Sequence, residues 1–295
     1  MLDQERIFSV LELLNLLNQS NKIASKLLQS YYRSKKLIGS KDRRFISKSF
    51  WNIIRHRFKI NWHLNYLGIE VTLEKEIMLE LFFLNKDYCN NISKIKKLFI
   101  VKYKEIKTFH EVDFKLLYDL NFHEFYNKEM PEHIFYELPK YLLESLKKGF
   151  KNEWRDVALS LNEEGFFDIR VNTIKGKSRD DIYHLLKDLK VPFELTKYSP
   201  LGIRFLNRFP IEGHKLFKKG CIEIQGEASQ LVALLLDAKP GMQVADLCSG
   251  AGGKALILAD IMKNKGRILS LDTNKKRLLK AGLRLKRAGV HNVER

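Results

Sequence analysis

Val244-Ala-Asp-Leu-Cys-Ser-Gly-Ala-Gly-Gly-Lys254 is the stretch of sequence that decides the fold. It reads as a buried strand, a glycine-rich loop and the start of a helix. A second strand-like stretch, Arg267-Ile-Leu-Ser-Leu271, follows and leads directly to Asp272. Strand, glycine loop, helix, strand and acidic residue, in that order, open a nucleotide-type cofactor site in doubly wound α/β domains. The sequence therefore predicts a Rossmann-like domain here.

The glycines of this loop have a chemical consequence. Gly250, Gly252 and Gly253 allow the backbone to turn sharply and to approach a ligand closely. The N-terminus of the following helix offers free N–H groups to an anionic group. Asp272 lies 26 residues beyond Asp246, near the spacing at which a carboxylate accepts hydrogen bonds from both ribose hydroxyls. A tight turn without a ligand is the alternative. The predicted cofactor-binding residues are Cys248, Ser249, Gly250, Ala251, Gly252, Gly253, Lys254 and Asp272.

The chain is strongly basic. It has 53 Lys and Arg against 35 Asp and Glu among 295 residues, which gives a formal net charge of +18. An excess of this size favours a polyanionic partner, most often nucleic acid. The charge is also clustered, because twelve Lys and Arg but only one acid, Asp42, lie between Lys22 and Lys59. Aromatic residues are interleaved with them, so a nucleic-acid interface is favoured over a merely solvated surface.

Three domains are predicted along the chain. Residues 1–135 have apolar residues at helical spacing and almost no Gly, with no Pro before Pro131, which predicts an all-helical domain. Residues 136–224 mix helical patterns with short strand patterns such as Asp168-Ile-Arg-Val-Asn172, which predicts a small α+β linker domain. Residues 225–295 contain the glycine loop and are predicted to form the N-terminal part of the Rossmann-like domain.

Several classes of protein are disfavoured. The chain has no run of about 18 uncharged apolar residues, so no membrane-spanning helix is predicted. Its first residues lack the basic and apolar regions of a signal peptide. Cys89, Cys221 and Cys248 are far apart and odd in number, which fits a reducing cytosol rather than a disulfide framework or a zinc site. The His residues show no metal spacing. We expect a cytoplasmic protein with no metal and no membrane association.

The loop also carries a family resemblance. Asp246-Leu-Cys-Ser-Gly-Ala-Gly-Gly-Lys254 resembles the first motif of the Sun/Fmu (RsmB-like) RNA 5-methylcytosine methyltransferases, typically Asp-Leu-Cys-Ala-Ala/Gly-Pro-Gly-Gly-Lys. Ala251 replaces the usual Pro and Ala255 the usual Thr. The resemblance is collinear from about residue 5 to the end. Four other segments carry it: Ile38-Gly-Ser-Lys-Asp-Arg-Arg-Phe45 followed by Arg55, Leu138-Pro-Lys-Tyr-Leu142, Asp168-Ile-Arg-Val-Asn172, and Gln225-Gly-Glu-Ala-Ser-Gln230.

This resemblance implies a fold and a function. The expected fold is multidomain, with an all-α NusB-like N-terminal domain, a small α+β linker domain and an incomplete Rossmann-like α/β methyltransferase domain. The implied cofactor is S-adenosyl-L-methionine, and the implied reaction is methylation of carbon 5 of a cytosine in small-subunit ribosomal RNA. The NusB-like domain is expected to bind this RNA. The residues expected to contact it are Lys35, Lys36, Arg43, Arg44 and Arg55.

The resemblance also implies that the catalytic residues lie elsewhere. The family uses two cysteines that correspond to positions downstream of Arg295. One attacks carbon 6 of cytosine, the other helps to remove the proton from carbon 5, and an Asp beside the first contacts the pyrimidine ring. A substitute nucleophile would have to be activated and to reach the base. The family has Cys at the position of Cys248 without that role, so we expect no catalytic residue in this chain.

Two other functions stay open at this stage. A non-catalytic RNA-binding protein would act through the NusB-like domain and keep a vestigial Rossmann half. A nicotinamide dehydrogenase would use the glycine loop, but the collinear segments and the basic N-terminal region disfavour it.

The last 70 residues raise a question of stability. With two complete strands, the sheet would expose unpaired backbone groups and apolar side chains. We expect this region to be poorly ordered alone or to need a separate polypeptide that completes the methyltransferase domain.

Overall fold

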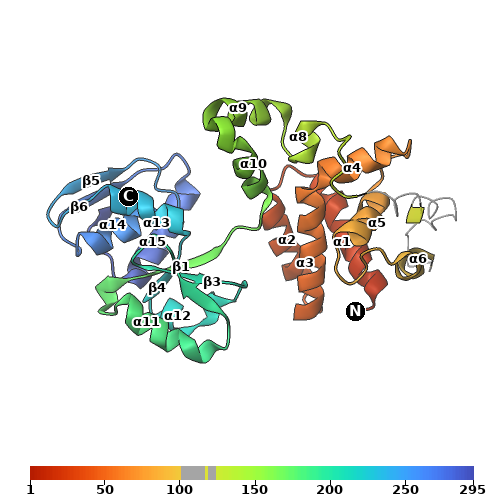
Figure 1. Ribbon diagram of the computed structural model, residues 1–295. Helices are drawn as coiled ribbons and strands as arrows, with labels where there is room; N and C mark the ends of the chain where they lie inside the picture. Colours follow the sequence, from red (N-terminus) through yellow and green to blue (C-terminus); the bar gives the residue numbers. More distant parts are fainter. Residues whose placement is uncertain (101–116, 119–123) are drawn as a thin grey trace. The chain divides into compact units, whose positions relative to one another are not determined.

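The computed structural model describes residues 1–100, 117–118 and 124–295 (Figure 1). Its contacts divide the chain into two compact units, Met1–Glu163 and Glu164–Arg295. The described residues of the first unit form helices, and both β-sheets lie in the second. The contacts group residues 136–163 with the helical unit, whereas the predicted boundary follows residue 135. The division into three domains stays a prediction.

The helical unit has one main core and one smaller core. Apolar residues such as Ile7, Phe50 and Ile77 form the main core, which holds the first six helices together. Trp154 and Leu143 belong to the smaller core under the last three. The helices are α1 (Asp3–Asn18), α2 (Ala24–Ser34), α3 (Ser40–Arg55), α4 (Arg57–Tyr66), α5 (Leu73–Phe83), α6 (Ile92–Ile100), α8 (Glu132–Phe135), α9 (Lys140–Phe150) and α10 (Trp154–Asn162). No described helix combines the length and the apolar character needed to cross a membrane.

A buried acid lies inside this main core. Glu80 on α5 is fully buried, and its Oε1 accepts a hydrogen bond from Asn52 Nδ2 at 2.9 Å. Its Oε2 has no hydrogen-bond partner among the described residues. Burial raises the pKa of Glu80 from 4.5 to about 7, and the hydrogen bond from Asn52 opposes this only in part. The folded state therefore favours the protonated carboxyl.

The raised pKa of Glu80 predicts a loss of stability as pH rises. The native state holds a proton that the unfolded chain releases above pH 4.5, so the contribution is fully present below pH 4.5 and is lost as pH rises through about 7. We expect Glu80→Gln, which stays neutral, to stabilise the helical unit by about 2–3 kcal/mol at pH 8 relative to wild type. Urea unfolding at pH 5 and pH 8 measures this. Glu70→Gln, at an exposed carboxylate, is the matched control. If Glu80→Gln and wild type lost the same free energy of unfolding between pH 5 and pH 8, the prediction would be contradicted.

The second unit begins with a four-stranded antiparallel sheet in the order β2-β3-β1-β4. Ile169 and Ile203 on one face join Ile182 and Leu216 in a core. The elements are β1 (Phe167–Val171), α11 (Arg179–Leu186), β2 (Phe193–Leu195), β3 (Gly202–Phe205), α12 (Lys215–Lys218) and β4 (Ile222–Ile224). The sequence pattern predicts strands over residues 168–172, 202–206 and 221–225 and a helix over residues 179–189, where the structure has β1, β3, β4 and α11. It does not predict the edge strand β2.

The unit ends with a parallel sheet in the order β5-β6-β7. Helices connect its strands, as in doubly wound α/β domains. The elements are α13 (Glu227–Leu235), β5 (Gln243–Asp246), α14 (Gly253–Ile261), β6 (Arg267–Ser270), α15 (Lys275–Ala288) and β7 (Val293–Glu294). The apolar spacing of Leu278, Ala281, Leu285 and Ala288 predicts a helix over residues 275–288, and α15 has the same bounds. The sequence also predicts two complete strands and, over residues 290–295, the approach to a third. That approach already pairs with β6 as β7.

Candidate functional site

The glycine loop joins β5 to α14 at the carboxyl end of β5. Gly250 and Gly252 have φ angles of +56° and +80°, a conformation that L side chains rarely adopt. A Cβ at Gly252 would lie 2.9 Å from the Cβ of Ala281 on α15, so the loop approaches that helix too closely for a side chain. α14 begins at Gly253, and the N–H groups of its first turn lack partners inside the helix. The loop therefore has the geometry of an anion-binding turn.

Asp272 follows β6 and meets the loop. Its Oδ2 accepts a hydrogen bond from the backbone N–H of Gly250, and its Oδ1 accepts one from that of Asn274, both at 2.7 Å. These two N–H groups, Asn274 first, hold the pKa of Asp272 below its ordinary value. Each carboxylate oxygen retains a second lone pair. The ionised carboxylate of Asp272 therefore lies beside the glycine loop, as the sequence pattern predicts.

Lys254 closes the loop from inside. Its Nζ donates to the carbonyl oxygen of Cys248 at 3.0 Å and lies 3.6 Å from Oδ1 of Asp246. Lys254 therefore contacts the loop and is not a freely solvated lysine. Asp246 Oδ2 and Ser249 Oγ are buried beside it and have no hydrogen-bond partner among the described residues. Buried polar atoms without partners are rare in folded proteins, and they fit a loop that binds a polar ligand.

Two side chains that the sequence reasoning did not single out hold the loop from outside. Arg284 Nη1 donates to the carbonyl of Ala251 at 2.9 Å, and Gln225 Nε2 donates to that of Gly253 at 3.2 Å. Glu223, which is buried, fixes Arg284 through an ion pair of 3.1 Å. Gln225 lies in a segment that carried the family resemblance. Nothing in the spacing of Glu223 and Arg284 marked them, because 61 residues separate the two.

The Arg-Val-Asn segment of β1 connects the two sheets. Arg170 is fully buried, and its Nη1 donates to Oδ2 of Asp260 on α14 at 2.8 Å. Asp260 also accepts hydrogen bonds from the backbone N–H and the hydroxyl of Thr173. Asn172 Nδ2 donates to the carbonyls of Gly220 and Ala288. These side chains therefore fix α14 and α15 against the antiparallel sheet.

The three cysteines lie in different surroundings. Cys221 is buried, and Cys89 belongs to the helical unit. Cys248 is exposed in the loop, but no described residue forms a hydrogen bond with its thiol as a base would. In the part of the chain that the structure describes, no group of three His, Cys, Asp or Glu residues could hold a metal ion.

The basic segment is less uniformly exposed than its sequence indicated. Lys59 is 3% exposed, and its Nζ lies 3.5 Å from Oε1 of Glu137 and 4.8 Å from the ring centroid of Tyr126. Arg57 forms a two-point ion pair with the buried Glu76. Both cations are therefore paired with acids of the helical unit and are less available to a nucleic acid.

The predicted RNA contacts divide into three groups. Lys35 lies 3.3 Å from Glu12, and Arg43 donates to the carbonyl of Ile38 at 2.8 Å, so both already have partners. Lys36 and Arg44 are exposed. Arg55 is half-buried and lies over the ring of Trp51, 6.0 Å from its centroid.

One face of α3 carries most of the available charge. Lys41, Arg44, Lys48, Trp51 and Arg55 follow one another at steps of three and four residues, which aligns them along the helix. Lys41, Arg44 and Lys48 are exposed and form no ion pair with a described acid. We call these five residues the α3 stripe. It unites cations with an aromatic ring, as single-stranded nucleic acid requires.

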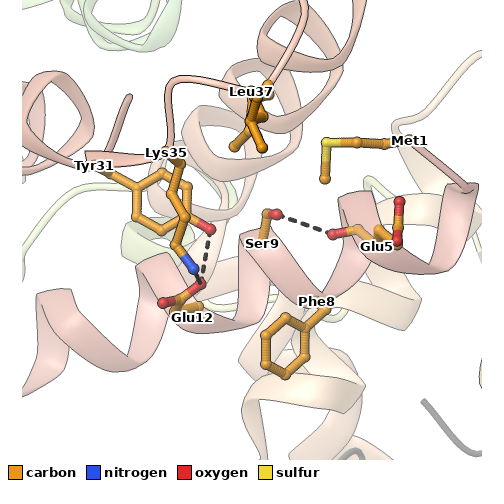
Figure 2. A pocket seen from close by; sticks show the side chains of 9 residues that line it. Met1, Glu5, Phe8, Ser9, Glu12, Tyr31, Lys35 and Leu37 are labelled. Atoms are coloured by element: carbon orange, nitrogen blue, oxygen red, sulfur yellow. Dashed lines mark hydrogen bonds and ion pairs between the residues drawn. The ribbon is translucent and has the colours of Figure 1, made fainter. Parts of the chain in front are cut away.

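The helical unit also contains a cavity of about 290 Å³ between α1 and the end of α2 (Figure 2). Glu12 accepts a hydrogen bond from the hydroxyl of Tyr31 at 2.8 Å and pairs with Lys35 at 3.3 Å. Apolar side chains, among them Leu37 and Phe8, also line the wall. Its polar groups satisfy one another, so the cavity has no feature of a methyl-transfer site.

Known proteins resemble the chain in two matched regions. Residues 138–212 match the RsmF/B-like methyltransferase ferredoxin-like domain, and residues 233–294 match the 16S rRNA methyltransferase RsmB/F domain. The chain is 29% identical to ribosomal RNA small subunit methyltransferase B of Pseudomonas syringae over 147 residues, which is 50% of this chain and 33% of that protein. It is 32% identical to the 28S rRNA (cytosine-C(5))-methyltransferase of Mus musculus over 143 residues, 43% of this chain and 31% of that protein.

A solved structure covers more of the chain. The crystal structure of PH0851 aligns with 100% of this chain and 69% of that one, with a TM-score of 0.69 and 21% sequence identity, which shows a shared fold. The chain spans about a third of the length of the curated relatives that it matches. Residues 138–212 and 233–294 therefore match two domains of one family in the order in which they follow each other, and the chain belongs to the Sun/Fmu (RsmB/F-like) family of rRNA cytosine-C5 methyltransferases.

Proposed function

We propose that residues 225–295 bind S-adenosylmethionine, and that the chain is the cofactor-binding and RNA-binding part of an enzyme that methylates carbon 5 of a cytosine in small-subunit rRNA. One observation carries this proposal. The ionised Asp272 lies within hydrogen-bond distance of the glycine loop, 2.7 Å from the N–H of Gly250. The names of the RsmB/F domain and of the Pseudomonas relative support the choice of small-subunit rRNA.

The residues of the loop fit this cofactor. Asp272 accepts hydrogen bonds from the two ribose hydroxyls with its remaining lone pairs. The first turn of α14 binds the amino-acid carboxylate through its N–H groups. Gly250 and Gly252 keep the backbone free of side chains where the cofactor lies. When bound, the cofactor supplies an electrophilic methyl group on a sulfonium sulfur.

Residues outside this chain complete the reaction in our proposal. Leu247, Leu269 and Leu271 follow or form the strands of the parallel sheet and are 68%, 37% and 42% exposed. Parallel sheets in α/β domains are covered on both faces, so further helices and strands are expected to pack here. They would supply the two cysteines, either from a longer protein that includes this sequence or from a separate polypeptide. They would also cover the exposed leucines of the sheet.

A second function has its own supporting observation. The α3 stripe presents unpaired cations beside Trp51, whether or not the chain takes part in catalysis. A non-catalytic RNA-binding protein acting through a NusB-like helical domain is therefore the alternative. Binding of S-adenosylmethionine separates the two functions, because only the methyltransferase needs it.

The cofactor assignment predicts that Asp272→Ala weakens S-adenosylmethionine binding about 30- to 100-fold, because charge-assisted hydrogen bonds to both ribose hydroxyls are lost. Isothermal titration calorimetry with the full chain measures this affinity. Asp188→Ala removes another exposed carboxylate in the same unit and should leave the affinity unchanged. Equal affinities of wild type and Asp272→Ala would show that the ribose is bound elsewhere.

The RNA-binding assignment predicts a result for the α3 stripe. Reversing Lys41, Arg44 and Lys48 to Glu should weaken binding of a single-stranded RNA about tenfold to hundredfold in the full chain and flatten its salt dependence, because phosphate contacts are lost. Fluorescence anisotropy at several salt concentrations measures both quantities. A triple reversal in and after α9, at Lys140, Lys148 and Lys151, is the control with the same charge change. If both variants bind alike, the stripe is not the interface.

A further inference from the structure

The second unit holds more of the net charge than the basic N-terminal segment indicates. Residues 164–295 contain 25 Lys and Arg but only 14 Asp and Glu. Seven of these cations lie on α15, which contains no acid. Of the 14 acids, Glu223 is buried and bound to Arg284 and Arg287. The two arginines near the C-terminal end of α15 are therefore partly neutralised, and the uncancelled charge of the helix lies on its other five cations, which form no ion pair with a described acid.

The cations of α15 are aligned. Lys276, Lys280 and Arg287 stand at i, i+4 and i+11, which is one face of the helix, opposite the buried Ala281 and Leu285. Lys276 and Lys280 are exposed and form no ion pair with a described acid. At about 1.5 Å per residue, this face extends for roughly 16 Å from the end near Asp272.

Other elements continue this face at the end of α15. Arg287 lies over the ring of Phe217 on α12, 3.9 Å from its centroid. Gly220, just after α12, approaches the backbone of Arg287 so closely that a Cβ would lie 2.1 Å from its carbonyl oxygen. A Cβ at Gly289 would lie 3.0 Å from Nζ of Lys175. Two distant segments therefore meet α15 here.

These segments add exposed lysines. Lys218 and Lys219 end α12, Lys175 precedes Gly176, and all three are exposed without an ion-pair partner among the described acids. Cations from three separate segments thus lie together, whereas an ordinary solvated helix face would involve the lysines of one helix only. We call Lys175, Lys218, Lys219, Lys276, Lys280 and Arg287 the α15 track.

We propose that the α15 track binds the phosphate backbone of the substrate RNA, as a second RNA-binding surface in addition to the α3 stripe. The proposal rests on the proposed function, because it takes RNA as the substrate. A row of cations about 16 Å long spans two to three phosphate spacings of a single strand. The track begins near Asp272, so a strand bound along it passes beside the cofactor loop.

Charge favours RNA over a protein partner. Leu279 and Leu283 are exposed on α15, and an acidic protein helix could use them. The lysines outnumber these leucines, however, and extend beyond α15 to α12 and Lys175, where no exposed apolar residue accompanies them. A surface with cations from three segments matches an extended polyanion better than one amphipathic helix.

A triple charge reversal tests the track. Lys219→Glu, Lys276→Glu and Lys280→Glu are combined in the full chain, and binding of a fluorescein-labelled 20-nucleotide single-stranded RNA is followed by anisotropy. We expect the affinity to fall about tenfold to hundredfold and the slope of log K against log salt to fall by about 2, because each contact contributes about 0.7. The control reverses Lys187, Lys190 and Lys197 on either side of β2, the sheet edge opposite β4. It should change the affinity less than twofold.

The outcomes separate this inference from the proposed function. If the track variant binds RNA like the control while the α3-stripe variant binds poorly, the track is not an RNA surface and the proposed function stands. If wild type itself does not bind RNA, both fail. Calorimetry with S-adenosylmethionine and the thermal unfolding midpoint should match wild type in the track variant. A lower RNA affinity together with a lower thermal unfolding midpoint would indicate misfolding of the variant. In that case Lys280→Gln, which only removes one charge, decides: the inference is overturned unless this variant also binds RNA more weakly.

Discussion

Replacing Asp260 with alanine should lower the free energy of unfolding of the unit Glu164–Arg295 by about 3–5 kcal/mol. The guanidinium of Arg170 is fully buried and depends on this carboxylate, 2.8 Å away. Burial lowers the pKa of Arg170, and Asp260 opposes that shift. Without Asp260, the buried guanidinium would lose its hydrogen-bonded counter-ion and keep only the more distant charge of Glu223, and Thr173 would lose its two hydrogen bonds.

Urea unfolding monitored by circular dichroism measures the effect of Asp260→Ala. The exposed Asp237 pairs with Lys239, and Asp237→Ala should change stability by less than about 1 kcal/mol because surface pairs contribute little. The double variant Arg170→Met with Asp260→Leu should recover part of the loss, since apolar residues of similar size often replace a buried ion pair at little cost. Equal stabilities of Asp260→Ala and Asp237→Ala would contradict the structural role of the pair.

Methyl transfer to cytosine should be absent from a protein of these 295 residues alone. Carbon 5 of cytosine becomes reactive only after a thiolate adds to carbon 6, and no described cysteine is paired with a base that would activate it. An assay with methyl-labelled S-adenosylmethionine and unmodified small-subunit rRNA measures the reaction. Addition of a polypeptide with the family's two cysteines should restore it.

Cys248 decides how a positive assay is interpreted. It is the exposed cysteine of the cofactor loop, so Cys248→Ser is the informative variant. Turnover that disappears in Cys248→Ser would identify Cys248 as an unexpected nucleophile. Turnover that persists in this variant would have no chemical route in our account and would refute it.

The fold was predictable where the sequence pattern is local. α15 alternates Lys and Arg with apolar residues at helical spacing over its whole length, and the predicted bounds match. The Asp246–Lys254 motif fixed β5 and the start of α14 to within one residue. β2 was missed because Phe193-Glu-Leu195 is an edge strand of three residues, which is too short for its apolar–polar alternation to be distinguished from a loop.

The candidate site was predictable only in its backbone motif. Glycine spacing and the acid after β6 predicted the loop and Asp272, which the structure brings together. Arg284 contacts Ala251 across 33 residues, and the burial of Lys59 depends on Glu137, 78 residues away. Such contacts arise from tertiary packing, and lysines are usually exposed, so no local signal distinguishes Lys59 from its neighbours.

Hydrogen–deuterium exchange of the full chain with and without S-adenosylmethionine tests the cofactor site most directly. Bound ligand slows exchange where it covers or orders the backbone. We expect slower exchange in residues 248–254 and 272–274, and no change in β1, which lies in the other sheet. Absence of binding, or protection that spares both the loop and Asp272, would contradict the account.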